Sequence, residues 1–259
     1  MRRLPFFIAK RYLLAEHRQH AVGLLSKVAV GAVAVAAFSL FLVLSGFTGL
    51  KDYALAFTDI FDSDLIVSPK EGKSLDFGPE QERFLNNIAG VIATTKIVEE
   101  KIFLKYKDQS RIALLRGVDS SYTRVTPMDT LIYTGTWFND SRPEVVPGYT
   151  VALDLALSAR DYGNLIELYA PIPGANIMAA TSPDQVFQSE LVVASGIYQV
   201  NDQINDQFVF TSIEAAQRLF GWDKNSISSV GIKTKTNDLD DLINNIDKAF
   251  NYKANVKTR

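Results

Sequence analysis

The sequence contains no cysteine, and its two histidines, His17 and His20, both lie within the first 20 residues. Disulfide bonds and thiolate metal sites are therefore excluded, and the lack of thiols is compatible with an oxidising compartment. Residues 21–259 contain neither cysteine nor histidine, and this absence removes the commonest nucleophile–base pairs from that region. We therefore expect no catalytic residues, no metal site and no cofactor.

The chain also lacks a complete phosphate-binding loop. The stretch "IVSPKEGKS" (Ile66–Ser74) ends in Gly-Lys-Ser, but Val67 stands where the motif requires its first glycine. The following "LDFGP" interrupts the helix that should start there to cradle a phosphate. We do not expect this chain to bind ATP.

Only one long apolar run is present. Val28 to Phe47 is 20 residues without a charge, which at about 1.5 Å per residue spans the roughly 30 Å hydrocarbon core of a bilayer. The segment Ala54-Leu55-Ala56 has the A-x-A pattern of a signal-peptide cleavage site. A signal peptide usually has an apolar region of only about 7–15 residues. The run therefore favours a retained transmembrane helix over 28–50, preceded by an amphipathic elbow helix at 1–27 on the cytoplasmic membrane surface.

Charge is distributed unevenly about this run. Residues 1–50 hold six Lys/Arg and one acidic residue, which leaves 21 Lys/Arg and 28 Asp/Glu in residues 51–259, a net charge of −7. The positive-inside rule places the N-terminus in the cytoplasm and the large domain outside. An acidic domain without a basic patch argues against binding of nucleic acid.

One face of the predicted membrane helix carries a stripe of small residues: Ala29, Ala32, Ala36, Ser39 and Gly46. Small residues on one stripe allow a second helix to approach closely, which predicts that this helix belongs to a bundle. The alternative is that alanine and glycine are simply common in membrane helices. No second apolar run of this length occurs in the sequence, so a packing partner would come from elsewhere.

Residues 51–259 alternate between strand-like and helix-like patterns without internal repeats, which predicts an α+β domain. We expect strands at 91–99, 101–105, 111–117, 165–169, 191–199, 207–211 and 226–235, and helices at 79–89, 150–159, from Ser212 to before Gly221, and from near Asn237. The segment Ala170–Ser189 is a long, proline-containing connection between two strands. Loops of this length are often functional, although a plain surface excursion is equally compatible with it.

Several segments resemble the LolC/LolE branch of ABC-transporter permeases. The run "FFIAKRYLLAEHRQHAVGLLSKVAVGAVAVAAFSLFLVLSGFTGL" is similar to the family's elbow helix and first membrane helix. Further on, "ALLRGVDSSY", "VVPGYTVALDLALSARDYGNLIELYAPIPG" and "VVASGIYQVNDQINDQFVFTSIEAAQRLFG" are similar to its later elements, in family order. The usual Gly-Asp is replaced by Tyr162-Gly163-Asn164, which is typical of a divergent branch.

The resemblance implies a fold and a role. It implies a MacB-like periplasmic core domain over 51–259, with a membrane-proximal subdomain (51–118 plus 207–259) and a distal inserted subdomain (119–206). The family has four membrane helices, so the sequence is expected to be the N-terminal part of a permease. The implied protein is not itself an enzyme. Its implied partners are a cytoplasmic ABC ATPase dimer, a second permease subunit, a lipoprotein cargo and a periplasmic lipoprotein carrier.

By the same resemblance, part of the 170–189 loop becomes a candidate contact with the carrier: Pro171, Pro173, Gly174, Asn176, Ile177 and Met178. Two alternatives remain open. One is another MacB- or FtsX-type permease of the inner membrane, for export or for regulation of a cell-wall hydrolase. The other is a single-pass, membrane-anchored binding domain.

Overall fold

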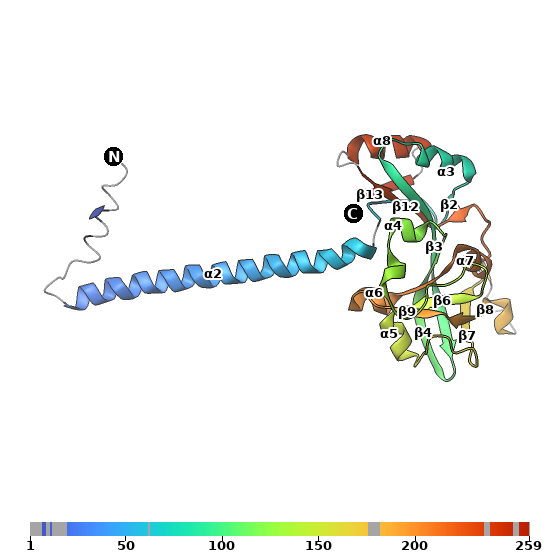
Figure 1. The fold of residues 1–259 in the computed structure, drawn as a ribbon, viewed down its shortest axis with the longest axis horizontal. Coiled ribbons are helices and arrows are strands. Elements are labelled where there is room, and N and C mark those ends of the chain that lie inside the picture. Colours follow the sequence, from blue (N-terminus) through green and yellow to red (C-terminus); the bar gives the residue numbers. More distant parts are fainter. Residues whose placement is uncertain are drawn as a thin grey trace. The chain divides into compact units, whose positions relative to one another are not determined.

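The computed structural model of the chain describes residues 7–8, 11, 20–61, 63–175, 182–235, 239–250 and 254–258. The chain divides into two compact units, Met1–Ala56 and Phe57–Arg259. The first contains most of a long helix, and the second is a mixed α/β domain (Figure 1).

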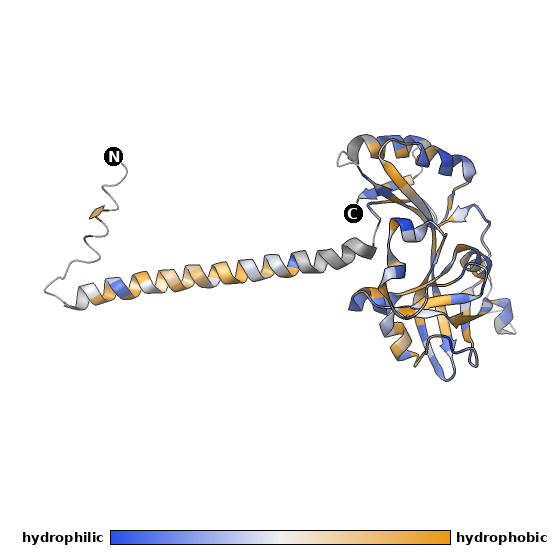
Figure 2. Cartoon of the chain, in the orientation of Figure 1, coloured by the Kyte–Doolittle hydropathy of each residue, from blue (hydrophilic) through white to orange (hydrophobic). Residues whose placement is uncertain are grey.

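Helix α2 runs from His20 to Phe61 without interruption. Its 42 residues are roughly 63 Å long, about twice the thickness of a hydrocarbon core. The part from Gly23 to Lys51 is long and apolar enough to cross a membrane, and Figure 2 shows the hydrophobic colouring along it. The helix therefore extends beyond both ends of the predicted 28–50 segment. Of the predicted elbow at 1–27, residues 20–27 belong to α2, Phe7, Ile8 and Arg11 are helical, and the rest lies outside the described residues.

The first and last strands of the second unit belong to one antiparallel sheet, which with its helices we call the α/β lobe. Its strands are β1 (Leu65–Pro69), the first half of β3 (Val91–Tyr106), β12 (Ser229–Thr234) and β13 (Ala254–Thr258), in the order β13-β1-β12-β3. Helix α3 (Pro79–Asn86) lies between β1 and β3, and α8 (Leu239–Ala249) lies between β12 and β13. This connectivity and strand order are those of a ferredoxin-like split βαβ unit.

Local chemistry positions the two helices of this lobe. Pro79 occupies the first turn of α3, and the Gln81 side chain accepts a hydrogen bond from the Gly78 N–H at 3.0 Å. In α8, Leu242 and Ile246 recur at four-residue spacing and are buried. Phe250 follows α8 and stacks on Phe77, with ring centroids 6.0 Å apart. Figure 1 shows α3 and α8 together at one end of the domain.

The second half of β3 belongs to a different structure, which we call the barrel lobe. It pairs with β4 (Gln109–Val118) and then continues through β10 (Phe208–Ser212), β6 (Glu144–Pro147), β8 (Phe187–Ala194) and β7 (Ile166–Pro171). β7 pairs back onto β3, with Phe103 opposite Tyr169. Among the described residues, these six strands therefore form a closed circuit of hydrogen bonds.

The barrel interior is filled by alternate residues of these strands, which the pleat directs to one face. They belong to the larger hydrophobic cluster and include Ile102, Leu104, Leu115, Leu168 and Val192. Helix α7 (Ile213–Phe220) packs across β4 and β10. Its N-cap is Ser212, whose hydroxyl accepts from the Ala215 N–H at 3.3 Å, and it ends at Gly221 in the left-handed conformation (φ 66°).

A second, aromatic cluster covers the outer face of β4, β6 and β10. It is built around Tyr122, Trp137, Tyr198 and Phe210. Burial raises the pKa of Tyr198, whose hydroxyl reaches the carbonyl oxygens of Ile204 (2.9 Å) and Phe208 (3.1 Å). The covering elements are short: α4 (Tyr122–Val125), η1 (Met128–Leu131), β5 (Ile132–Gly135), β9 (Gly196–Tyr198) and α6 (Asp202–Gln207).

Several predicted elements differ from the structure. The two strands expected at 91–99 and 101–105 are one strand, because β3 continues from the α/β lobe into the barrel. The helix expected at 150–159 is shorter, since α5 (Tyr149–Asp154) is followed by Ala156 in the left-handed region (φ 52°). The strand expected at 191–199 is divided at Ser195 into β8 and β9, which pair with different partners.

Strand pairing also divides the domain differently from the predicted 51–118 plus 207–259 and 119–206. β4, β10 and α7 belong to the barrel lobe, so the insertion into the α/β lobe begins within β3 near Ile97 and ends before β12. The small strands β2 (Leu75–Asp76) and β11 (Ser226–Ile227) pair with each other. Which lobe is closer to the membrane remains a prediction.

Candidate functional site

The predicted small-residue stripe lies entirely on α2. Ala29, Ala32, Ala36, Ser39 and Gly46 are all exposed to solvent, and no heavy atom lies within 4 Å of a Cβ built on Gly46. Within the described residues, therefore, no second helix packs on this stripe. Its role in helix packing stays a prediction.

The predicted partner loop is the tip of a β-hairpin in the barrel lobe. Pro171 ends β7 opposite Phe187 at the start of β8, and the Ile172 N–H donates to the Val186 carbonyl at 2.8 Å. Pro171, Pro173 and Gly174 are exposed, and Gly174 adopts a left-handed conformation (φ 76°) that favours glycine. Asn176, Ile177 and Met178 lie outside the described residues. The short 3-10 helix η2 (Pro183–Gln185) precedes β8 in the chain.

An exposed apolar row lies on the outer sheet surface beside this hairpin. Ile112, Phe103 and Tyr169 stand opposite one another on β4, β3 and β7. Ile112 is 66% exposed and Phe103 is 40% exposed, and Phe187 at the base of the hairpin is 41% exposed. Exposed apolar residues that are contiguous on one surface are typical of interaction sites.

Charged side chains border this row and fix its strands. Lys105 and Glu167 approach to 3.8 Å on β3 and β7. The Tyr169 hydroxyl donates a hydrogen bond to Glu167, and this bond raises the pKa of Tyr169. On the far side, Arg218 of α7 pairs with Glu190 of β8 at 3.0 Å, and the Gln188 amide donates to the Arg218 carbonyl at 2.8 Å. The base of the hairpin is therefore anchored to the barrel.

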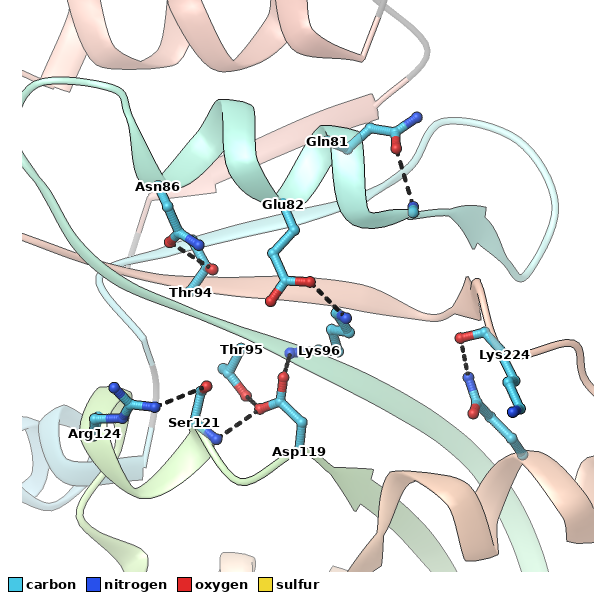
Figure 3. Close-up of polar contacts among 12 residues, drawn as sticks. Gln81, Glu82, Asn86, Thr94, Thr95, Lys96, Asp119, Ser121, Arg124 and Lys224 are labelled. Atoms are coloured by element: carbon cyan, nitrogen blue, oxygen red, sulfur yellow. Dashed lines mark hydrogen bonds and ion pairs between the residues drawn. The ribbon is translucent and has the colours of Figure 1, made fainter.

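A polar junction joins the two lobes at the middle of β3 (Figure 3). Asp119, directly after β4, accepts hydrogen bonds from the Thr95 hydroxyl (2.7 Å), the Lys96 N–H (3.2 Å) and the Ser121 N–H (3.1 Å). Burial raises the pKa of Asp119 even though these donors favour the carboxylate. Lys96 also pairs with Glu82 of α3 at 2.7 Å.

A second set of contacts in the junction lies further along β3, at Glu99. Glu99 pairs with Arg116 of β4 at 2.6 Å, and the Arg116 guanidinium lies 4.3 Å from the centre of the Phe208 ring. The Glu99 N–H donates to the Ser228 hydroxyl at 2.7 Å, immediately before β12. Together with the Asp119 contacts, these bonds fix β3 where its strand partner changes from β12 to β4.

Sequence reasoning missed this junction. The pattern Asp119-Ser120-Ser121 at the end of a strand is typical of a turn in which an Asp carboxylate accepts from a backbone N–H two residues on. That pattern could have placed the local bond, but the bonds from Thr95 and Lys96 depend on tertiary pairing. No group of three or more potential metal ligands occurs among the residues that the structure describes.

No family model matches the chain, and no curated protein matches it. Among solved structures, the chain is similar to the extracellular domain of the ABC-type transporter YknZ from Gram-positive bacteria (TM-score 0.53, 15% identity, 76% of this chain and 99% of that chain covered). It is also similar to the periplasmic region of MacB from Actinobacillus actinomycetemcomitans (TM-score 0.52, 10% identity, 75% and 87% covered).

The domain has a MacB-like fold. The predicted fold class, one N-terminal apolar helix followed by a MacB-like α+β domain, is therefore confirmed. At this level of identity the likeness establishes the fold, and the narrower resemblance to LolC/LolE proteins is not confirmed.

Proposed function

We propose that this chain is part of a permease subunit of an ABC transporter, in which the MacB-like domain responds to ATP hydrolysed by another protein. The observation that carries the proposal is the combination of a MacB-like fold with a preceding apolar helix that is long enough to span a membrane. In this role the basic N-terminal segment is cytoplasmic and the acidic domain lies outside the inner membrane, as the charge distribution favours.

The chain's contribution in this proposal is mechanical. A cytoplasmic ABC ATPase dimer hydrolyses ATP, and a second permease subunit packs against the small-residue stripe of α2. Residues 20–61 form one helix, which is suited to carry movement along its length. The bonded junction at Asp119 and Glu99 favours movement of the two lobes as a connected body.

Affinity purification of the protein from its native membranes tests this role. We expect an ABC ATPase to be recovered in comparable amount, together with vanadate-sensitive ATP hydrolysis. Recovery of the intact protein without any ATPase would contradict the proposal and would favour the single-pass binding domain.

Within this class, we propose release of lipoproteins from the inner membrane as the specific role, with a periplasmic carrier docking at the β7–β8 hairpin. The order of family-like segments in the sequence supports this proposal. The exposed Pro171, Pro173 and Gly174 support it as well, because Pro171 stands opposite the exposed Phe187. Apolar surface beside an exposed loop suits a carrier that binds acyl chains.

A photo-crosslinking residue at Gly174 tests the specific role, and Gly72 is the matched control. Both glycines have left-handed φ values (76° and 79°) and no heavy atom within 4 Å of a built Cβ, but Gly72 lies in the α/β lobe. We expect position 174, and not position 72, to capture a lipoprotein carrier. Capture of an envelope hydrolase or an outer-membrane channel at position 174 would instead favour another MacB- or FtsX-type permease.

A further inference from the structure

A cleft of about 550 Å³ opens on the barrel lobe, at the end of β7 opposite to the hairpin. Three chain segments form it: residues 136–144, which lead into the start of β6, Arg160 and Tyr162 before β7, and Ser195 between β8 and β9. Its volume lies within the range of about 300–1,000 Å³ that is usual for ligand sites. The surface assigned to the carrier does not include any of these residues.

Backbone hydrogen bonds hold the walls of the cleft to the barrel. The Thr136 N–H donates to the Ser195 carbonyl at 3.1 Å, and the Arg160 N–H donates to the Ala194 carbonyl at 2.6 Å. Gly196 allows the close approach of the first pair, because a Cβ there would lie 2.4 Å from the Thr136 carbonyl oxygen. The walls are therefore fixed before any ligand arrives, which lowers the entropic cost of binding.

The carboxylate that lines the cleft, that of Glu144, already contacts other residues of the lining. Glu144 is only 7% exposed, and its carboxylate accepts from the Asn139 N–H at 2.9 Å. Arg142 lies 3.6 Å from the other carboxylate oxygen. Asp161, next to Arg160, accepts instead from the Tyr106 hydroxyl at 2.7 Å. Glu144 thus orders the wall and is not available to a cation.

The positive charge of the cleft is more accessible. Arg160 is exposed, and within the described residues no carboxylate lies at ion-pair distance from its guanidinium, which contacts the Thr136 hydroxyl at 3.4 Å. The Arg142 side chain is 66% exposed. Among the residues that line the cleft there are therefore two guanidinium groups and one carboxylate.

Aromatic rings lie in the same lining. Trp137 is half-buried against Phe138, with ring centroids 4.9 Å apart, and Tyr162 is 63% exposed. Thr136 and Asn139 add a hydroxyl and an amide group that can bond to a peptide backbone. Because polar side chains predominate, the lining offers little surface for a lipid acyl chain.

We propose that this cleft binds a carboxylate side chain on an extended acidic segment of a partner protein, with Arg142 and Arg160 as the binding groups. A guanidinium donates two parallel hydrogen bonds to a carboxylate, which gives both strength and orientation. Trp137 and Tyr162 cover the aliphatic part of the acidic side chain, and the neighbouring polar groups bond to its backbone.

Fluorescence of Trp137 in the full chain, held in nanodiscs of uncharged lipid, tests the proposal. The chain has two tryptophans, so Trp222→Phe leaves Trp137 as the reporter. Titration with a hexapeptide of alternating glutamate and glycine should change the fluorescence saturably. We expect the glutamine analogue of this peptide to bind at least about tenfold more weakly, since charge-assisted hydrogen bonds are lost.

Variants assign the effect to the cleft. Arg142→Gln and Arg160→Gln should each weaken binding of the glutamate peptide about tenfold. Arg83→Gln on the exposed surface of α3 should leave it unchanged. Equal binding of the two peptides would overturn the proposal, even if the variants failed to fold. Displacement of the peptide by inorganic phosphate, or by anionic vesicles of phosphatidylglycerol, would also overturn it in favour of a phosphate site.

Discussion

At the scale of single residues, Asp119 carries much of the connection between the lobes. Its carboxylate accepts three hydrogen bonds, two of them from β3, in a position where burial raises its pKa. Because the folded protein then binds the proton of Asp119 more tightly than the unfolded chain does, protonation favours folding. This contribution is complete below the ordinary Asp pKa of about 3.9 and is lost as pH rises through the higher folded-state value.

The first prediction concerns Asp119→Asn, which removes this titration. The difference in free energy of unfolding, native protein minus variant, should fall as pH rises from about 4 towards neutrality. Urea denaturation followed by tryptophan fluorescence at a series of pH values measures it. A difference that stays constant with pH would show that Asp119 does not titrate abnormally in the folded protein.

The second prediction concerns Gly117, over which α7 crosses β4. A Cβ on Gly117 would lie 2.3 Å from the Ala216 Cβ, so Gly117→Ala should destabilise the domain by about 1–3 kcal/mol through overpacking. Adding Ala216→Gly to the Gly117→Ala variant should recover part of the lost stability. Gly163→Ala, where the nearest atom is a side-chain oxygen at 3.4 Å, should cost little. Thermal unfolding of the native protein and these three variants would contradict the packing argument if Gly117→Ala behaved like Gly163→Ala.

At the scale of elements, local chemistry decided which parts could be predicted. Both ends of α7 follow from the sequence, because Ser212 caps it and Gly221 ends it through bonds within a few residues. The length of β3 does not follow, since its two halves are stabilised by β12 and β4, which are remote in sequence. The short β5 and the separation of β9 from β8 were missed for the same reason, as the pairing of β5 with β9 brings together residues more than 60 positions apart.

The third prediction concerns α2 as a mechanical element. Leu55→Pro should break the helix, because proline costs about 3 kcal/mol or more in a helix interior. We expect the complex to retain ATP hydrolysis but to lose its transport activity. Leu55→Ala is the control and should be close to native. Native transport by the proline variant would show that continuity of α2 between the membrane and the domain is not required.

At the scale of the whole molecule, the sequence predicted the order of the parts better than their boundaries. A long apolar run and uneven charge are properties of composition, so a membrane helix with a domain after it could be inferred directly. The division into lobes could not, because it depends on a closed circuit of strands that returns from β7 to β3. The hairpin at 170–189 was predicted as a connection between strands. The cleft was not, since its lining comes from three separate segments.

The central claim is that ATP hydrolysis by a partner is transmitted to the MacB-like domain. Hydrogen exchange of the purified transporter, measured by mass spectrometry with ATP and vanadate and again with ADP, tests this claim most directly. We predict that peptides from the β7–β8 hairpin and from the junction around Asp119 change their protection between the two states. Identical exchange throughout residues 63–258, in a preparation that hydrolyses ATP, would contradict it.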